Sequence, residues 1–209
     1  MSNVAGKAYA INAISPMRRY LTWLNEFSFM FARAKPSTLT SLLGLSFIHF
    51  ARWVIVRRDD WTDLGQGKQN LQNDYLLFCS NFNGTWDQYI DAFADGFPSG
   101  LDFFWTTSTK YPQSIPITPF KEYIRVNQAD TDFYYNATPG AAQWDVKSAL
   151  RVRRELLALA QESRELSPAE FRKSYVARLL KVQHDLGAQG YAPVASNDTY
   201  FAERKRNGA

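Results

Sequence analysis

The stretch Asp74–Phe93, with the sequence DYLLFCSNFNGTWDQYIDAF, carries the clearest local signals in the chain. Its first part, residues 75–80, is a short and almost wholly apolar run, which is typical of a strand buried on both faces. Asn83 and Gly84 then predict a turn, because asparagine tolerates a left-handed backbone and glycine has no Cβ to clash. The stretch therefore predicts a buried strand that ends in a tight turn.

A helix should begin directly after this turn. Thr85 stands at the N-cap position and Gln88 follows three residues later, which is the pattern of a capping box. Apolar residues at helical spacing then predict one stripe that faces a sheet: Trp86, Tyr89, Ile90 and Phe93. Carboxylates fall on the opposite side of this helix: Asp87, Asp91 and Asp95. We expect these carboxylates to form a solvated surface, because no further metal ligands accompany them.

The N-terminal part predicts a strand followed by a helix. Residues 8–14 alternate large and small side chains and stop at Ser15-Pro16, which predicts a first strand ended by proline. From 17 to 34 the pattern becomes helical. The stripe that we expect to pack on the sheet consists of Tyr20, Leu24, Phe27 and Phe31. Trp23 and Met30 widen this stripe and are the two residues that we expect to remain outside.

Two further strands complete the predicted sheet. The run at 47–56 is the strongest strand signal in the chain, and 101–107 predicts a fourth strand. The predicted order is then βαββαβ, the ferredoxin-like arrangement. This is an α+β fold whose antiparallel sheet carries both helices on one face.

The rest of the chain predicts a helical extension. A short helix begins at Pro119, and longer amphipathic helices are expected at 144–161 and 171–186. We divide the chain into a ferredoxin-like core at 1–110, a helical extension packed on it at 111–190, and a loose tail at 191–209.

Composition narrows the function only coarsely. The chain has 209 residues, a net charge of +4 and one cysteine, Cys79, which excludes an internal disulfide and favours a cytoplasmic location. No nucleic-acid-binding motif accompanies the mild basic excess, so no nucleic-acid partner is expected. No apolar stretch is long enough to span a bilayer, so any membrane association should be peripheral.

The strand at 47–56 gives the most useful functional inference. Both of its faces are apolar, although such a strand normally leaves one face of the sheet open. We therefore expect a cover: the C-terminal helices, a second subunit or a bound apolar ligand. A ligand pocket over the sheet would use His49, Arg52, Trp53, Asn81, Asn83 and Trp105. The alternative is that His49 and Arg52 are satisfied core residues, with the arginine paired to a carboxylate.

No motif assigns catalysis. The sequence has no Ser/His/Asp elbow, phosphate loop or dinucleotide fingerprint, so catalytic residues stay unknown and enzyme activity stays open. His49 and His184 are the only histidines and no zinc-type spacing occurs, so no metal site is expected. The helical phase of His184 predicts an exposed side chain.

The residues LFCSNFNGTW at 77–86 resemble an uncharacterised bacterial family with a ferredoxin-like core. More distantly, they resemble the dye-decolorizing peroxidase and chlorite-dismutase group. This second resemblance implies haem as a cofactor and peroxidase-like chemistry. Asn83 stands where that group carries its functional aspartate, and His184 is the only helical candidate for its proximal histidine.

Three functions follow as expectations. The first is a binding or interaction module that encloses an apolar ligand or partner surface over its sheet, as a homodimer or in a larger complex. The second is a haem-dependent, peroxidase-like enzyme. The third is a peripheral membrane-associated subunit that uses the helix at 17–34, with Trp23 and Met30 facing the lipid.

Overall fold

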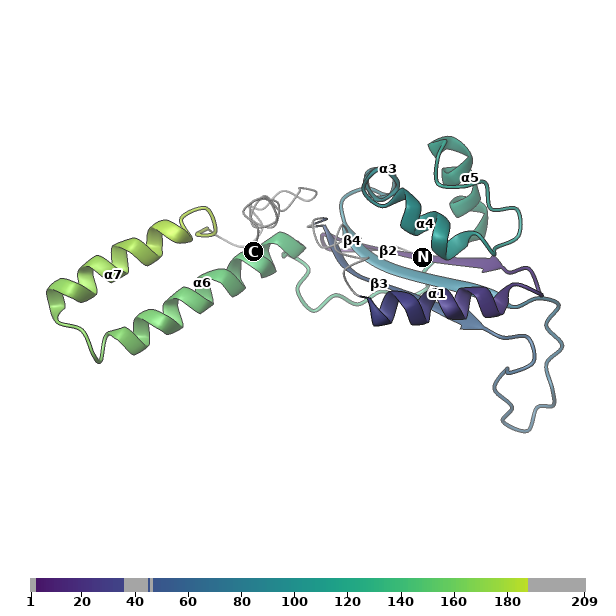
Figure 1. Ribbon diagram of the computed structural model, residues 1–209, viewed down its shortest axis with the longest axis horizontal. Helices are drawn as coiled ribbons and strands as arrows, with labels where there is room; N and C mark the ends of the chain where they lie inside the picture. Colours follow the sequence, from purple (N-terminus) through teal and green to yellow (C-terminus); the bar gives the residue numbers. More distant parts are fainter. Residues whose placement is uncertain (1–2, 36–44, 46, 188–209) are drawn as a thin grey trace.

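The computed structural model describes residues 3–35, 45 and 47–187 as an α+β fold with an antiparallel sheet (Figure 1). The strands are β1 (Val4–Ala5), β2 (Ala8–Pro16), β3 (Ile48–Val56), β4 (Tyr75–Asn83) and β5 (Gln128–Ala129). They lie in the order β1-β2-β4-β3, and the short β5 also pairs with β2. The predicted strands at 8–14, 47–56 and 75–80 are confirmed, whereas the predicted tail at 191–209 lies outside the described residues.

The helices divide into two groups. They are α1 (Thr22–Ala34), α3 (Trp86–Gly96), α4 (Pro98–Trp105), α5 (Ile117–Asn127), α6 (Gln143–Glu162) and α7 (Pro168–Lys181). The first four contribute side chains to one core on one face of the sheet. Helices α6 and α7 pair with each other as a hairpin that projects away from the sheet (Figure 1).

The segment at 101–107 corrects the sequence prediction. It forms most of α4 rather than a fourth strand, and Pro98 starts this helix at its first turn. Leu101, Phe104 and Trp105 are buried at i, i+3 and i+4, so the apolar run has helical and not strand period. The last strand of the predicted βαββαβ order is therefore absent at 101–107. The sheet edge beside β2 is occupied instead by the two-residue strands β1 and β5.

An aromatic core joins the sheet to the helices. The buried face of β4 presents Phe78 and Phe82 to the helices. The ring of Phe82 is stacked on that of Tyr89 of α3, with 3.8 Å between the ring centroids. Phe78 meets Trp105 of α4 edge-on at 4.9 Å. The predicted start of α3 is also confirmed, because Thr85 and Gln88 form both hydrogen bonds of a capping box.

The core extends past the boundary expected from the sequence. Phe120 and Ile124 of α5 are almost fully buried in the same cluster, and β5 pairs with Asn12 and Ala13 of β2. Residues 117–129, which the sequence analysis assigned to the helical extension, thus lie within the folded core.

Candidate functional site: open apolar surfaces

The face of the sheet turned away from the helices, here called the outer face, is built from aligned cross-strand rows. One row consists of Ile14, Leu77 and Val54 from β2, β4 and β3. The row beside it consists of Pro16, Tyr75 and Val56. Cross-strand neighbours of this kind lie in direct contact, so the rows form one continuous apolar surface.

Only part of the outer face is covered. Ile14 and Val54 are each 42% exposed, and Phe50, further along β3, is 52% exposed. Cys79 at the centre of β4 and Ala10 of β2 are buried. The open part therefore comprises the row of Leu77 and continues along β3 to Phe50, which lies opposite Asn81.

The segment that connects β5 to α6 covers the other end of the outer face. Asn12 donates a hydrogen bond to the Thr131 hydroxyl at 3.0 Å, and Asn81 donates one to the Tyr134 hydroxyl. The side-chain oxygen of Asn83 accepts a hydrogen bond from the Gln143 backbone N–H at 2.7 Å. These amides fix the path of the covering segment on the sheet.

Gly6, in the turn between β1 and β2, allows the covering segment to pack closely against this turn. Its φ is +64°, and a Cβ on it would lie 2.2 Å from the Pro139 carbonyl oxygen. Only glycine combines this conformation with so close a contact. The covering segment is therefore an integral part of the fold.

The six residues predicted to bind a ligand do not gather in one place. Arg52, Asn81 and Asn83 are on the outer face, whereas Trp53 and Trp105 pack edge-on in the core at 5.8 Å. The alternation of the strand had placed His49 and Trp53 on the same face. A bulge between Ile48 and Phe50 breaks that alternation.

His49 and Arg52 are exposed and are not core residues. Partial desolvation lowers the pKa of the His49 ring, and a hydrogen bond with Asn83 opposes this shift. Arg52 is exposed opposite Cys79. The interpretation of Arg52 as a buried, paired core arginine is therefore wrong.

Helix α1 presents a second apolar surface, and its buried and exposed sides differ from those expected from the sequence. Trp23 and Met30 are 64% and 67% exposed, as expected. Tyr20, Phe27 and Phe31, which were expected to pack inward, are 73%, 60% and 46% exposed. We call these five residues the α1 stripe. Trp23, Phe27, Met30 and Phe31 share one side of the helix, because they fall at helical spacing, and Tyr20 lies in the turn just before the helix.

Small polar side chains occupy the buried side of α1. Thr22, Asn25, Ser28 and Ala32 are its buried residues. Asn25 donates to the Phe104 carbonyl at 3.0 Å and accepts from the Thr107 hydroxyl at 2.7 Å. Their spacing of three to four residues was the available signal, since a row of small residues lets a helix approach its neighbour closely.

Asp74 fixes the N-terminal end of α1. Its carboxylate accepts hydrogen bonds from the Thr22 hydroxyl at 2.5 Å and from the Arg58 backbone N–H at 2.9 Å. Burial alone would raise the pKa of Asp74, but these hydrogen bonds lower it below the ordinary value. The ionised carboxylate therefore contributes to the docking of α1.

The α6–α7 hairpin carries a third apolar surface. A groove of about 930 Å³ is lined by Trp144, Leu150 and Leu157 of α6 and reaches the exposed His184 and Leu186. Ion pairs join α6 to the C-terminal part of α7 and to the residues that follow it. Arg178 contacts Glu155 at 2.8 Å and also Glu162, while Arg151 contacts Asp185 at 2.5 Å. The exposure predicted for His184 is confirmed.

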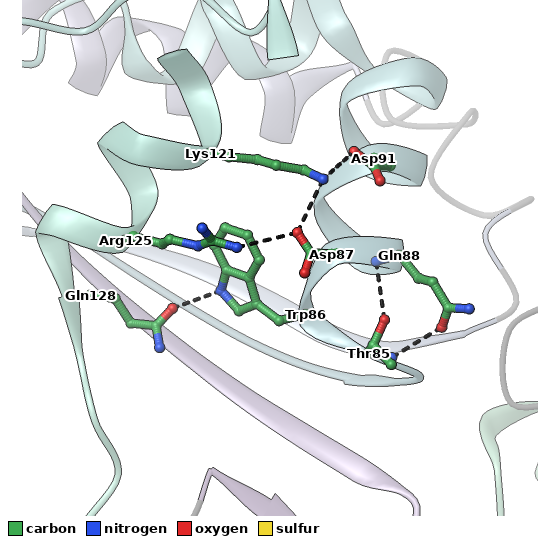
Figure 2. A network of polar contacts seen from close by, with 8 residues as sticks. All are labelled: Thr85, Trp86, Asp87, Gln88, Asp91, Lys121, Arg125 and Gln128. Carbon is green, nitrogen blue, oxygen red and sulfur yellow. Dashed lines mark hydrogen bonds and ion pairs between the residues drawn. The ribbon is translucent and has the colours of Figure 1, made fainter. Parts of the chain in front are cut away.

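The start of α3 is tied to α5 by a polar network (Figure 2). Lys121 lies between Asp87 and Asp91, at 3.1 and 2.7 Å, and the hydrogen bond to Asp91 raises the pKa of this lysine. Arg125 covers the ring of Trp86, whose indole donates to Gln128 at 2.8 Å. Asp87 and Asp91 of α3 thus bind cationic side chains of the chain itself.

The described residues offer neither a metal site nor a membrane-spanning helix. They contain no group of three or more His, Cys, Asp and Glu side chains that could hold a metal ion. Within the same residues, no helix has the length and apolar content needed to cross a bilayer. Comparison of the chain with protein-family models, curated proteins and solved structures returned no match.

Proposed function

We propose that this protein is an interaction module that binds a protein partner through the outer face of its sheet, and that the partner is a second copy of the chain. We further propose that the sheet is a reduced ferredoxin-like sheet. In this interpretation β5, which runs antiparallel to β2, takes the place of the last long strand.

The observation that carries the proposal is the open row of Ile14, Leu77 and Val54. Three adjacent strands contribute apolar side chains to it, and two of the three are 42% exposed. Contiguous apolar patches of this kind mark interaction sites more often than isolated exposed residues do. The α6–α7 hairpin, the intramolecular cover expected from the sequence, projects away from the sheet (Figure 1).

A second copy is the simplest cover for this face. Two sheets pack face to face at about 10 Å, and a two-fold axis would place each open row against its equivalent. Arg52 lies beside the row and would remain at the rim of such a contact. The covering segment at 130–142 would bound the contact on one side.

The core side of the sheet gives less support to a haem pocket. Trp53 lies 4.9 Å from both Phe78 and Phe104, measured between ring centroids, so aromatic side chains already occupy this layer. A haem between sheet and helices would have to displace them. The peroxidase-like function therefore remains the weaker proposal.

The test is the molar mass of the full chain, measured by light scattering at about 10–100 µM. We expect a dimer for the wild type and a monomer for Val54→Lys, because lysine would place a charge inside the contact. The matched control is Val126→Lys, which makes the same change at a residue of α5 that is 84% exposed. A monomeric wild type, or equal effects of the two substitutions, would contradict the proposal.

A further inference from the structure

The α1 stripe is an unusual surface because the polarity of its helix is reversed. A helix that covers a sheet normally buries its large apolar side chains. Helix α1 buries Thr22, Asn25 and Ser28 instead, packs only Phe29 partly against the core, and exposes the four stripe residues that belong to it. This surface lies on the helix side of the sheet and is thus separate from the outer face.

The buried contacts keep the α1 stripe turned outward. Asn25 is fully buried and bonded to both Phe104 and Thr107, while Thr22 is bonded to Asp74. Rotation of α1 to bury the stripe would leave these polar groups without partners in an apolar core, which is unfavourable. The stripe is therefore available to another surface without any change in the core.

Basic residues flank the α1 stripe at both ends. Arg18 and Arg19 precede the helix, Arg33 and Lys35 follow the stripe, and all four are exposed. The only acidic residue of α1, Glu26, is paired with Arg57 of the adjacent loop. Asp74 at the N-terminal end of α1 is buried and bonded to Thr22 and to the Arg58 backbone N–H, so its carboxylate does not reach the surface. Asp59 and Asp60 come after Arg57 and Arg58 on that loop. The surroundings of the stripe therefore carry a local excess of positive charge.

We propose that α1 binds an anionic lipid bilayer surface, with the α1 stripe inserted among the headgroups and the flanking basic residues on the phosphates. Tryptophan, tyrosine and phenylalanine are the side chains that favour this interfacial layer. Arginine and lysine at the ends of the helix supply the electrostatic attraction to anionic lipid. The stripe lies on a helix surface and not in a groove, so it suits a deformable layer of lipid.

The experiment is co-sedimentation of the full chain with phosphatidylcholine vesicles that contain either phosphatidylglycerol or no anionic lipid. We expect binding to the anionic vesicles, weakened as NaCl rises from about 0.1 to 0.5 M because salt screens the basic residues. The double variant Trp23→Ser, Met30→Ser should bind at least about tenfold more weakly, since it removes two inserted apolar side chains.

The matched control is Leu156→Ser, Leu180→Ser, which removes two side chains that are 50% and 60% exposed on the α6–α7 hairpin. It should bind vesicles as the wild type does. A second readout is tryptophan quenching by brominated lipid, which should decrease strongly in Trp23→Phe. The proposal is overturned if the wild type fails to bind anionic vesicles, or if both double variants lose binding equally. It is also overturned if the α1 variant abolishes self-association and leaves vesicle binding unchanged.

Discussion

Helices α1 and α3 cover the same face of one sheet, yet they are oriented in opposite ways. Helix α3 buries Tyr89, Ile90 and Phe93 and turns its carboxylates to solvent, where Lys121 and Arg125 bind them. Helix α1 buries small polar residues, packs Phe29 on Phe104, and exposes its other aromatic side chains. An apolar stripe in the sequence thus identifies the apolar side of a helix. Only the contacts made by the opposite side determine whether that apolar side faces the core or the solvent.

The largest expected difference between the two helices concerns their phenylalanines. Phe93 of α3 is 1% exposed, and Phe93→Ala should lower the free energy of unfolding by about 3–5 kcal/mol. Phe27 of α1 is 60% exposed, and Phe27→Ala should change it by no more than about 0.5 kcal/mol. Urea unfolding followed by circular dichroism measures both. Similar losses for the two variants would show that the α1 stripe is packed.

Most of the α3 region was predictable from the sequence. The strand at 75–80, the turn at Asn83-Gly84 and the cap at Thr85 each depend on local chemistry, and the structure confirms the strand and the capping box and gives Gly84 a φ of +102°. Strand β4 continues to Asn83, a few residues beyond the apolar run, because Asn81 and Phe82 still pair with both neighbouring strands.

The orientation of α1 could not be predicted in the same way. Helical period places Tyr20, Phe27 and Phe31 on one side, but the period is the same whether that side meets a sheet or another surface. The deciding contacts are Asn25 with Phe104 and Thr107, which lie 79 and 82 residues away in the sequence. Such non-local partners leave no mark on the local pattern.

The remaining differences have specific physical causes. The run at 101–107 is short and apolar, and such runs do not distinguish a buried strand from a buried helix. The bulge at Ile48/Phe50 shifts His49 out of register with Trp53. The open side of β3 was inferred correctly as apolar, because from Phe50 onward the alternation of the strand is regular.

The buried polar side of α1 should be sensitive to a single deletion. Asn25→Ala removes the partner of the Thr107 hydroxyl and of the Phe104 carbonyl, both in the interior. We expect a loss of about 1–3 kcal/mol in unfolding free energy. Ser28→Ala is the control, because the Ser28 hydroxyl bonds only to the Leu24 carbonyl of its own helix, and it should cost less than about 1 kcal/mol. Equal effects would argue against Asn25 as the residue that orients α1.

The smallest expected effect is the pH dependence of the contact between Asp74 and α1. The folded-state pKa of Asp74 lies below its ordinary value of 3.8, so ionisation stabilises the fold above that value. This contribution, about 1 kcal/mol, is lost as pH falls through the lowered folded-state pKa. Asp74→Asn should thus be less stable than the wild type at pH 7, and urea unfolding at decreasing pH should show the two converging. A difference that is constant from pH 7 to below the folded-state pKa would contradict this.

Thiol accessibility tests the outward orientation of the α1 stripe most directly, because Phe27 and Ser28 are adjacent in the sequence, yet Phe27 is exposed and Ser28 is buried. The single native cysteine, Cys79, is buried and provides the internal reference. In Phe27→Cys we predict one thiol that reacts with dithionitrobenzoate as fast as a free cysteine. In Ser28→Cys we predict that every thiol stays protected until the protein unfolds, because this position is 3% exposed. A reactive thiol at 28 together with a protected thiol at 27 would contradict the reversed orientation of α1.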